Sequence, residues 1–189
     1  FLLASPAYSA EATVGPYVSG NLGIAMPSDS DGTVEGAPLD FQTSYDTGWA
    51  IGVALGYNFG TIRLEGEVAY QKADEDKVGF SGGTFDSTYS KSARSFLVNG
   101  YYDFVNSSAF TPYLNAGLGY AKINWSGEGE SLNDSVFAYQ LGVGVGYALS
   151  KNVTIDAKYR YFATSDPKFD VTSMEFASHN LLLGVRMNF

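Results

Sequence analysis

The chain has 189 residues, enough for one large domain, and no Pro-rich or Ser-rich linker divides it. Its formal net charge is -9, with 11 Lys and Arg against 20 Asp and Glu, so it lacks the basic face that nucleic-acid binding requires. No cysteine is present, which excludes disulfides, thiolate metal sites and thiol nucleophiles, and no apolar run reaches the roughly 18 to 20 residues of a membrane helix.

The N-terminal stretch FLLASPAYSAEA carries an apolar run followed by small residues. Within it, Ala10-Glu11-Ala12 fits the A-x-A pattern that precedes signal-peptide cleavage. We expect residues 1–12 to be a signal-peptide remnant or a disordered N-terminal arm, and we assign residues 13–189 to a single domain.

Eight segments then alternate apolar residues with small or polar ones, which is the side-chain period of a β-strand. In chain order the apolar positions are Val18, Leu22 and Ile24; Trp49, Ile51, Val53, Leu55, Tyr57 and Phe59; Ile62, Leu64, Val68 and Tyr70; Phe96, Val98, Tyr102 and Phe104; Leu114, Ala116, Leu118 and Tyr120; Tyr139, Leu141, Val143, Val145 and Tyr147; Val153, Ile155, Tyr159 and Tyr161; and Leu181, Leu183, Val185, Met187 and Phe189. The pattern predicts about eight strands.

The connections between these segments alternate in length. Short ones fall at Gly60, at 105–111 and at 150–152, whereas long polar ones fall near 26–44, 72–93, 125–135 and 163–175. This is typical of an antiparallel up-and-down meander, which closes into a barrel when its last strand pairs with its first.

The opposite face of the strands decides which side of this barrel points inward. It carries a row of glycines, such as Gly142, Gly144 and Gly146, which would make a poorly covered outer surface. It also carries eight charged residues: Arg63, Glu65, Glu67, Asp103, Asp156, Lys158, Arg160 and Arg186. Four cations and four carboxylates can form a neutral buried network, with pairs such as Glu65 and Arg160, and the glycines leave room for it. The sequence therefore predicts a transmembrane barrel with its apolar face toward lipid and a charged plug inside.

Aromatic residues give a separate indication of a membrane. The strands that run toward the short turns end in outward rings: Tyr57, Phe59, Tyr102, Phe104, Tyr147 and Phe189. Such a belt marks a membrane interface.

Four stretches, TIRLEGEVAYQ, TPYLNAGLGYA, YQLGVGVGYALSKNVTIDAKYRY and HNLLLGVRMNF, resemble the small outer-membrane β-barrel superfamily of Gram-negative bacteria, which includes opacity proteins and OmpA-like surface antigens. The resemblance implies a location in the outer membrane and adhesive or antigenic specificity in the extracellular loops. It also implies that the outer-membrane assembly machinery reads the last strand, through Leu181, Leu183, Val185, Met187 and Phe189.

Two other patterns invite a chemical interpretation that the sequence does not favour. The acidic loop residues, among them Asp29, Asp31, Asp74 to Asp76, Glu128 and Glu130, could hold a divalent cation through carboxylate oxygens. The stretch SDSDG at Asp29 and Asp31 lacks a further acidic ligand at EF-hand spacing, so we predict solvated loops and no metal. Ser178 and His179 suggest a serine deacylase, but neighbours on a strand point to opposite faces and cannot act as nucleophile and base. We predict no catalytic residue and no cofactor.

Three outward cations, Lys72, Arg94 and Lys122, lie near the long-loop ends of three consecutive strands. They suit contact with lipopolysaccharide phosphates, although simple snorkelling toward the headgroups explains them equally well.

The function predicted from these patterns is that of an outer-membrane structural or surface-interaction protein, without enzymatic activity, acting through its loops. Its expected partners are lipids, lipopolysaccharide, the assembly machinery and an unidentified extracellular ligand. A small porin-like channel is the first alternative, and a soluble lipocalin-like carrier is the second.

Overall fold

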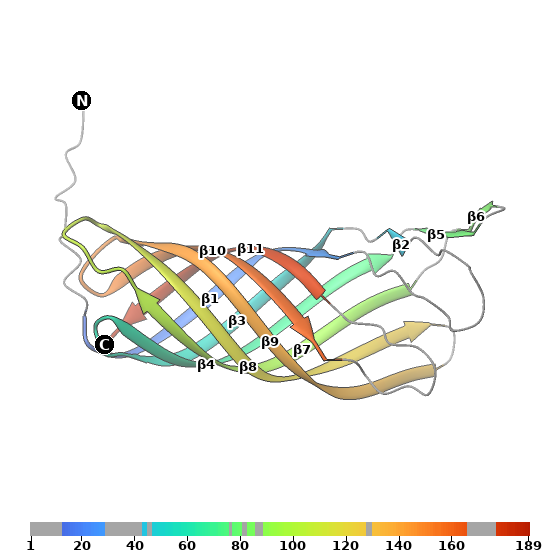
Figure 1. Ribbon diagram of the computed structural model, residues 1–189, viewed down its shortest axis with the longest axis horizontal. Coiled ribbons are helices and arrows are strands. Elements are labelled where there is room, and N and C mark those ends of the chain that lie inside the picture. Colours follow the sequence, from blue (N-terminus) through green and yellow to red (C-terminus); the bar gives the residue numbers. More distant parts are fainter. Residues whose placement is uncertain are drawn as a thin grey trace, which may run out of the picture.

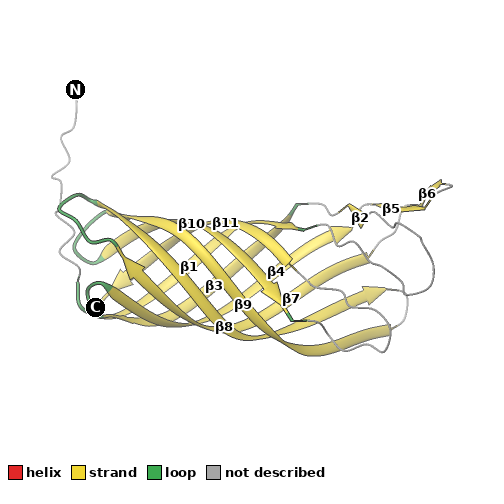
Figure 2. Cartoon of the chain, viewed as in Figure 1, coloured by secondary structure: helices red, strands yellow, loops and turns green. Residues whose placement is uncertain are grey.

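The computed structural model describes residues 13–28, 43–44, 47–75, 77–80, 83–85, 89–127, 130–165 and 177–189. In these ranges eight strands close into one antiparallel barrel in the order β1-β11-β10-β9-β8-β7-β4-β3 (Figures 1 and 2). Their bounds are β1 Gly15–Pro27, β3 Gly48–Asn58, β4 Ile62–Glu75, β7 Tyr89–Asp103, β8 Phe110–Gly127, β9 Glu130–Ala148, β10 Val153–Thr164 and β11 Ala177–Asn188. Three short strands, β2 Thr43–Ser44, β5 Lys77–Phe80 and β6 Gly83–Phe85, form a second sheet. The described part of the chain contains no helix able to span a membrane.

The barrel closes through the first and last of its strands. β1 pairs with β11 from Tyr17 opposite Asn188 to Pro27 opposite Ser178, and the Phe189 N–H donates to the Pro16 carbonyl at 3.0 Å. Each barrel strand thus has a partner on both sides, and no edge is left open. The predicted eight-stranded barrel is confirmed.

Short turns join strands at one end of the barrel, which we call the turn end, and the opposite end is the far end. At the turn end, β3 passes into β4 through residues 59–61. Gly60 has a φ of 104°, and glycine adopts this conformation at little energetic cost because it has no Cβ. Its N–H donates to the Asn58 side-chain oxygen at 2.8 Å. This turn aligns Asn58 opposite Arg63 and so sets the register of the two strands.

Two regions that the sequence predicts as long loops are largely strand. β8 and β9 stay paired up to Gly127 opposite Glu130, and β4 and β7 stay paired up to Glu75 opposite Tyr89. Apolar alternation reports only the part of a strand with one face in lipid, whereas the backbone ladder continues wherever both strands remain extended. The hydrophobic pattern therefore underestimates the length of these hairpins.

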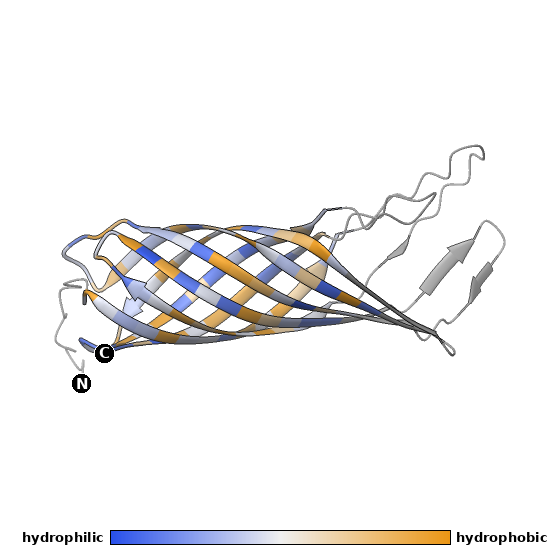
Figure 3. Ribbon diagram, turned by 90° about the horizontal axis from the view of Figure 1, so that it is seen from below, coloured by the Kyte–Doolittle hydropathy of each residue, from blue (hydrophilic) through white to orange (hydrophobic). Residues whose placement is uncertain are grey.

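Hydrophobic and hydrophilic residues alternate along the barrel strands (Figure 3), and their exposure differs with the same period. Leu22, Leu55 and Leu183 are outward and more than 60% exposed, whereas Ala54 and Leu182, each next to one of them in sequence, are buried. A surface this apolar is compatible with lipid and not with water, so the predicted orientation of the two faces holds.

Outward aromatic rings gather at both ends of this apolar surface. At the turn end Tyr57 packs against Phe59, Tyr102 against Phe104, and Phe110 against Tyr147, with centroid distances of 4.7, 5.2 and 4.9 Å. Toward the far end Trp49 packs against Tyr70 at 5.2 Å and Tyr120 against Phe137 at 6.4 Å. Two belts, of which the sequence predicted only the first, bound the membrane-spanning band.

Inward glycines make room for rings that lie on the barrel wall. A Cβ at Gly144 would lie 2.5 Å from both Cζ and the hydroxyl of Tyr113, and one at Gly56 would lie 2.6 Å from the Tyr17 hydroxyl. Both rings are buried. Glycine is required at these two positions because the opposing side chains occupy the space of a methyl group.

Candidate functional site

All eight charged residues of the predicted network lie inside the barrel. Seven of them are buried, and the Asp156 side chain is 15% exposed. They divide into two groups along the barrel axis, one at the turn end and one at mid-height.

The turn-end group is built around Arg63 and Asp103. Arg63 Nε donates to Asp103 Oδ2 at 2.7 Å and its Nη2 donates to Oδ1 at 2.8 Å, which is the strong bidentate geometry. The guanidinium also lies over the rings of Tyr101 and Tyr113, with its Cζ 4.2 and 5.0 Å from their centroids. Since Arg63 pairs in register with Tyr101 on β7, the stacking follows from the strand register.

A second ion pair lies nearby. Arg186 Nη2 donates to Asp156 Oδ1 at 3.4 Å, and the Arg186 Cζ lies 5.9 Å from the Tyr17 ring centroid. Asp156 on β10 lies in register with Gly184, two residues before Arg186 on β11. The pairing of β10 with β11 therefore brings the two charges together.

Glu65 is held by neutral donors. Its Oε2 accepts from the Tyr17 hydroxyl at 2.8 Å, and its Oε1 accepts from the Tyr101 hydroxyl at 2.5 Å and from Asn99 Nδ2 at 3.1 Å. Lys158 Nζ lies 3.5 Å from the same Tyr101 hydroxyl. Three donors from β1 and β7 compensate this buried carboxylate.

Glu67, and not Glu65, is the partner of Arg160. Arg160 Nη1 donates to Glu67 Oε1 at 3.1 Å, and the Glu67 Oε2 accepts from Asn99 at 2.7 Å and from Gln140 at 3.0 Å. The expected pairing of Glu65 with Arg160 is therefore wrong. Alternation assigns a residue to a face, but the height at which side chains meet across the barrel depends on strand register and tilt.

Neutral residues that the sequence analysis did not single out complete the network: Tyr17, Asn99, Tyr101, Tyr113 and Gln140. Gln140 Nε2 also donates to Asn99 Oδ1 at 2.6 Å, which links the β9 side of the wall to β7. Each of these residues shares the parity of the charged ones on its strand or lies among inward glycines. Extending the inward parity to neutral polar residues would have identified them.

Beyond Glu67 and Arg160, toward the far end, the buried side chains are apolar or neutral polar ones, the latter including Gln71, Ser178 and Asn180. Six buried residues form a cluster there: Leu97, Ala121, Ile123, Val136, Ala138 and Phe162. They come from β7, β8, β9 and β10, and we call them the apolar layer. The sequence analysis did not predict this layer, because it counted only charges and glycines on the inward face.

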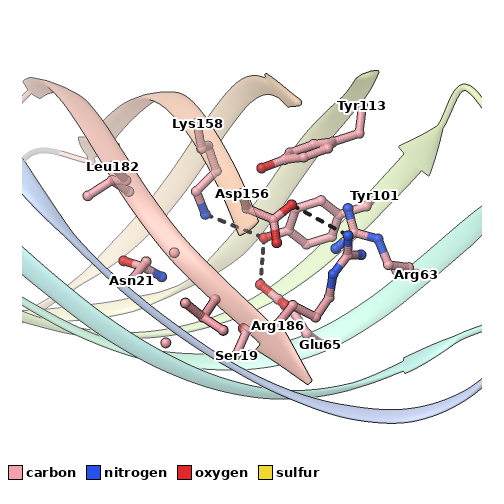
Figure 4. A pocket seen from close by; sticks show the side chains of 13 residues that line it. Ser19, Asn21, Arg63, Glu65, Tyr101, Tyr113, Asp156, Lys158, Leu182 and Arg186 are labelled. Carbon is pink, nitrogen blue, oxygen red and sulfur yellow. Dashed lines mark hydrogen bonds and ion pairs between the residues drawn. The ribbon is translucent and has the colours of Figure 1, made fainter. Parts of the chain in front are cut away.

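A small cavity remains within the turn-end network (Figure 4). Its volume is about 30 Å³, and its lining includes Arg63, Glu65, Lys158 and Asp156. A space of this size holds one or two water molecules and no larger solute. Around this cavity the side chains of the network fill the interior.

The predicted rim cations are outward on neighbouring strands. Arg94 on β7 pairs in register with Lys122 on β8 and with Tyr70 on β4, and its Cζ lies 5.9 Å from the Tyr70 ring centroid. Arg94 and Lys122 are exposed, and Lys72 is half-buried. The three side chains therefore occupy one sector at the far end of the lipid-facing band.

Ser178 and His179 point to opposite faces. Ser178 is fully buried inside the barrel, while His179 faces outward with its Nδ1 2.6 Å from the Tyr159 hydroxyl. They do not form a nucleophile–base pair. In the described ranges no group of three or more metal-ligating side chains is present.

Several predicted features fall outside the described residues, namely residues 1–12 and the acidic residues Asp29, Asp31, Asp76 and Glu128. Asp74 lies within β4 and Glu130 begins β9. The predicted assembly-signal residues are described: Leu181, Leu183, Val185, Met187 and Phe189 all face outward on β11 or directly after it.

Known proteins are similar to this chain in sequence or in fold. Outer membrane protein PagN of Salmonella typhimurium is 33% identical over 184 residues, which cover 81% of this chain and 76% of that protein. Opacity protein opA67 of Neisseria gonorrhoeae is 25% identical over 181 residues, which cover 72% of this chain and 76% of that protein. The crystal structure of Neisserial surface protein A superposes with a TM-score of 0.62 at 22% identity, covering 93% of this chain and 97% of that one. The family described as outer membrane protein beta-barrel domain matches residues 1–189. The chain therefore belongs to this family and is a β-barrel of the bacterial outer membrane.

Proposed function

We propose that this protein is a surface-interaction protein, adhesin-like or antigen-like, in which a closed barrel presents extracellular segments to a ligand or cell. The filled interior carries this proposal. A barrel plugged by buried ion pairs and an apolar layer supplies a rigid support and no route for solutes. The similarity to a named opacity protein supports the same role.

The filled interior argues against the two alternative functions. A porin-like channel requires a continuous aqueous path, whereas the cavity in the network measures only about 30 Å³. A lipocalin-like carrier requires an apolar interior that binds its ligand, whereas here most of the large apolar residues face outward and the interior holds a charged network. We also propose that the protein is not an enzyme, since the Ser178 and His179 side chains lie on different faces.

Cell binding tests the proposed function. Bacteria displaying the wild-type protein should adhere to host cells, and replacing residues 29–42 and 166–176 with short Gly-Ser linkers should abolish adhesion while the barrel still folds. The matched control replaces residues 106–108 in the turn between β7 and β8, at the opposite end of the barrel. Equal adhesion of wild-type and linker-replaced cells would refute the proposal.

We further propose that Lys72, Arg94 and Lys122 bind lipopolysaccharide phosphates. Their support is their position on three consecutive strands, β4, β7 and β8, at the far end of the lipid-facing band. Changing all three to Gln should lower the amount of co-purified lipopolysaccharide, and Lys151→Gln at the turn end should leave it unchanged. Unchanged lipopolysaccharide in the triple variant would favour unspecific snorkelling.

The last strand is the proposed recognition site of the assembly machinery. Its support is the outward apolar row that ends at Phe189, next to the closing seam with β1. Phe189→Ser should reduce the amount of folded protein in the outer membrane. Phe104→Ser, which removes another ring of the turn-end belt, is the control and should not reduce it.

A further inference from the structure

Two of the eight barrel strands in the described ranges lack a short turn. The connections 59–61, 104–109 and 149–152 join the other six in pairs, β3 with β4, β7 with β8 and β9 with β10. β1 and β11 are joined to their neighbours in the chain only through the longer connections 28–47 and 165–176. A short turn fixes the register of the two strands that it joins, and the seam between β1 and β11 has no such covalent link.

The chain at the start of β1 lies across the end of β11. The Pro16 carbonyl accepts from the Phe189 N–H at 3.0 Å. Gly15 has a φ of 153°, and a Cβ there would lie 2.9 Å from the Phe189 carbonyl oxygen, so the backbone passes too close for a side chain. Residues 13–16 therefore form a strap over the end of β11.

The turn between β9 and β10 bonds both the strap and the end of β11. The Thr13 hydroxyl donates to the Lys151 carbonyl at 2.8 Å. The Asn188 N–H donates to the Asn152 carbonyl at 2.8 Å, and Asn152 Nδ2 donates to the Asn188 carbonyl at 2.9 Å. Since β11 lies between β1 and β10 in the barrel, its end is held from both sides.

Asn152 differs from the asparagines of the other two short turns. Asn58 accepts from a backbone N–H of its own turn at 2.8 Å, and Asn106 donates to two carbonyls of its own turn at 3.1 and 2.9 Å. The turn of Asn152 is closed by another group, the Ser150 hydroxyl, which accepts from the Val153 N–H at 3.2 Å. The Asn152 side chain therefore bonds the end of β11 instead of closing its own turn.

We propose that residues 13–16 and 151–152 form a clamp, which takes the place of the turn that the seam lacks and keeps β11 closed against β1 at the turn end. The strap and the turn hold the same strand end, so the clamp opens and closes as one unit. Loss of the bond between Thr13 and Lys151 then loosens the bonds of Asn188 and Phe189 as well. Independent surface hydrogen bonds would affect only their own partners.

The test removes single bonds of the clamp and observes the others. Thr13→Val removes the hydroxyl donor and leaves every backbone bond of the seam in place, and Thr13→Ser restores the donor. Asn152→Ala removes the side-chain bond to Asn188. The matched control is Asn106→Ala, which removes the asparagine bonds of the turn between β7 and β8. Heat-modifiable migration on gels checks that the barrel of each variant has closed.

Amide hydrogen exchange, followed by nuclear magnetic resonance in detergent micelles, gives the readout at the Asn188 and Phe189 N–H groups. Thr13→Val and Asn152→Ala should each raise both exchange rates about fivefold, the effect of one lost hydrogen bond on the opening of the clamp. Thr13→Ser and Asn106→Ala should match the wild type.

Two results would overturn the proposal. One is unchanged exchange of the two N–H groups in Thr13→Val or Asn152→Ala, and the other is an equal rise in Asn106→Ala, which would indicate general loosening of the turn end. If Asn152→Ala yields no closed barrel, Thr13→Val alone decides. Adhesion of these variants is a separate measurement, so failure of the clamp leaves the proposed surface role untouched.

Discussion

The interior of the barrel is stabilised differently in its two halves, although every residue there occupies the same inward position of a strand. In the turn-end half, Arg63, Asp103, Arg186 and Asp156 form ion pairs among tyrosine rings. In the far half, the apolar layer contains Phe162 and no charged residue. The two halves meet at Glu67 and Arg160. Removing a partner from the charged half leaves an unpaired charge, whereas removing one from the apolar layer leaves a cavity, so the halves should respond to mutation in different ways.

The largest effect is expected where the halves meet. Arg160→Met leaves Glu67 buried without its cation and should lower the free energy of unfolding by about 3 to 5 kcal/mol. Adding Glu67→Gln should restore most of the lost stability, because a neutral amide can still form hydrogen bonds with Asn99 and Gln140. Urea unfolding in lipid vesicles, followed by tryptophan fluorescence, measures both. Equal stability of the single and double variants would show that the charge is not the source of the loss.

The apolar layer should respond through lost packing alone. Phe162→Ala should lower the free energy of unfolding by about 3 kcal/mol, with no rescue by any charge change in the turn-end half.

Planar-bilayer conductance sharpens the comparison. We expect low conductance for Arg160→Met with Glu67→Gln, because the apolar layer remains, and for Leu97→Ser with Phe162→Ser, because the ion pairs remain. Only the combined fourfold variant should conduct, and conductance in the first pair alone would show that the charged half is the sole seal.

A smaller effect is expected from the glycines that accommodate the rings. Gly144→Ala would force the Tyr113 ring away from the wall and should lower stability by about 2 kcal/mol. Gly66→Ala on the outer face should change stability by less than about 0.5 kcal/mol, because its methyl group meets no protein atom within 4 Å. Similar values for the two variants would mean that the tyrosine ring moves freely.

The smallest effect should come from a single neutral donor. Tyr17→Phe removes one of three hydrogen bonds to Glu65 and should lower the free energy of unfolding by about 1.5 kcal/mol. Tyr102→Phe, on the outer face, is the control and should be neutral. A loss as large as that of Arg160→Met would indicate that Tyr17 organises the entire turn-end network.

Alternation along the sequence was sufficient to predict the strands, the closure and the orientation of the two faces. It worked because lipid on one side requires an apolar row such as Leu181 to Phe189, and because the opposite row carries the glycines and charges that the barrel encloses. It also assigned Arg63 and Asp103 to the interior, where the structure brings them within 2.7 Å.

The parts that the sequence did not predict depend on register. Arg160 bonds Glu67 rather than Glu65 because strand tilt sets the height at which the side chains of β4 and β10 meet. Phe162 and Leu97 were not recognised as interior residues. Each is an apolar residue on the inward row, so it breaks the alternation, and the sequence alone does not show what it packs against. The extension of β8 and β9 to Gly127 and Glu130 could not be predicted from apolar alternation. Beyond the lipid-facing band neither face of a strand has to be apolar, so the alternation ends before the strand does.

The seam between β1 and β11 has a consequence for biogenesis. It joins residue 17 to residue 188, so none of its backbone hydrogen bonds can form until the ribosome has translated β11. A nascent or prematurely terminated chain would carry two unpaired strand edges, which readily pair with other chains. Closure of the barrel therefore requires β11, and the two edges of this seam stay unpaired until β11 reaches β1.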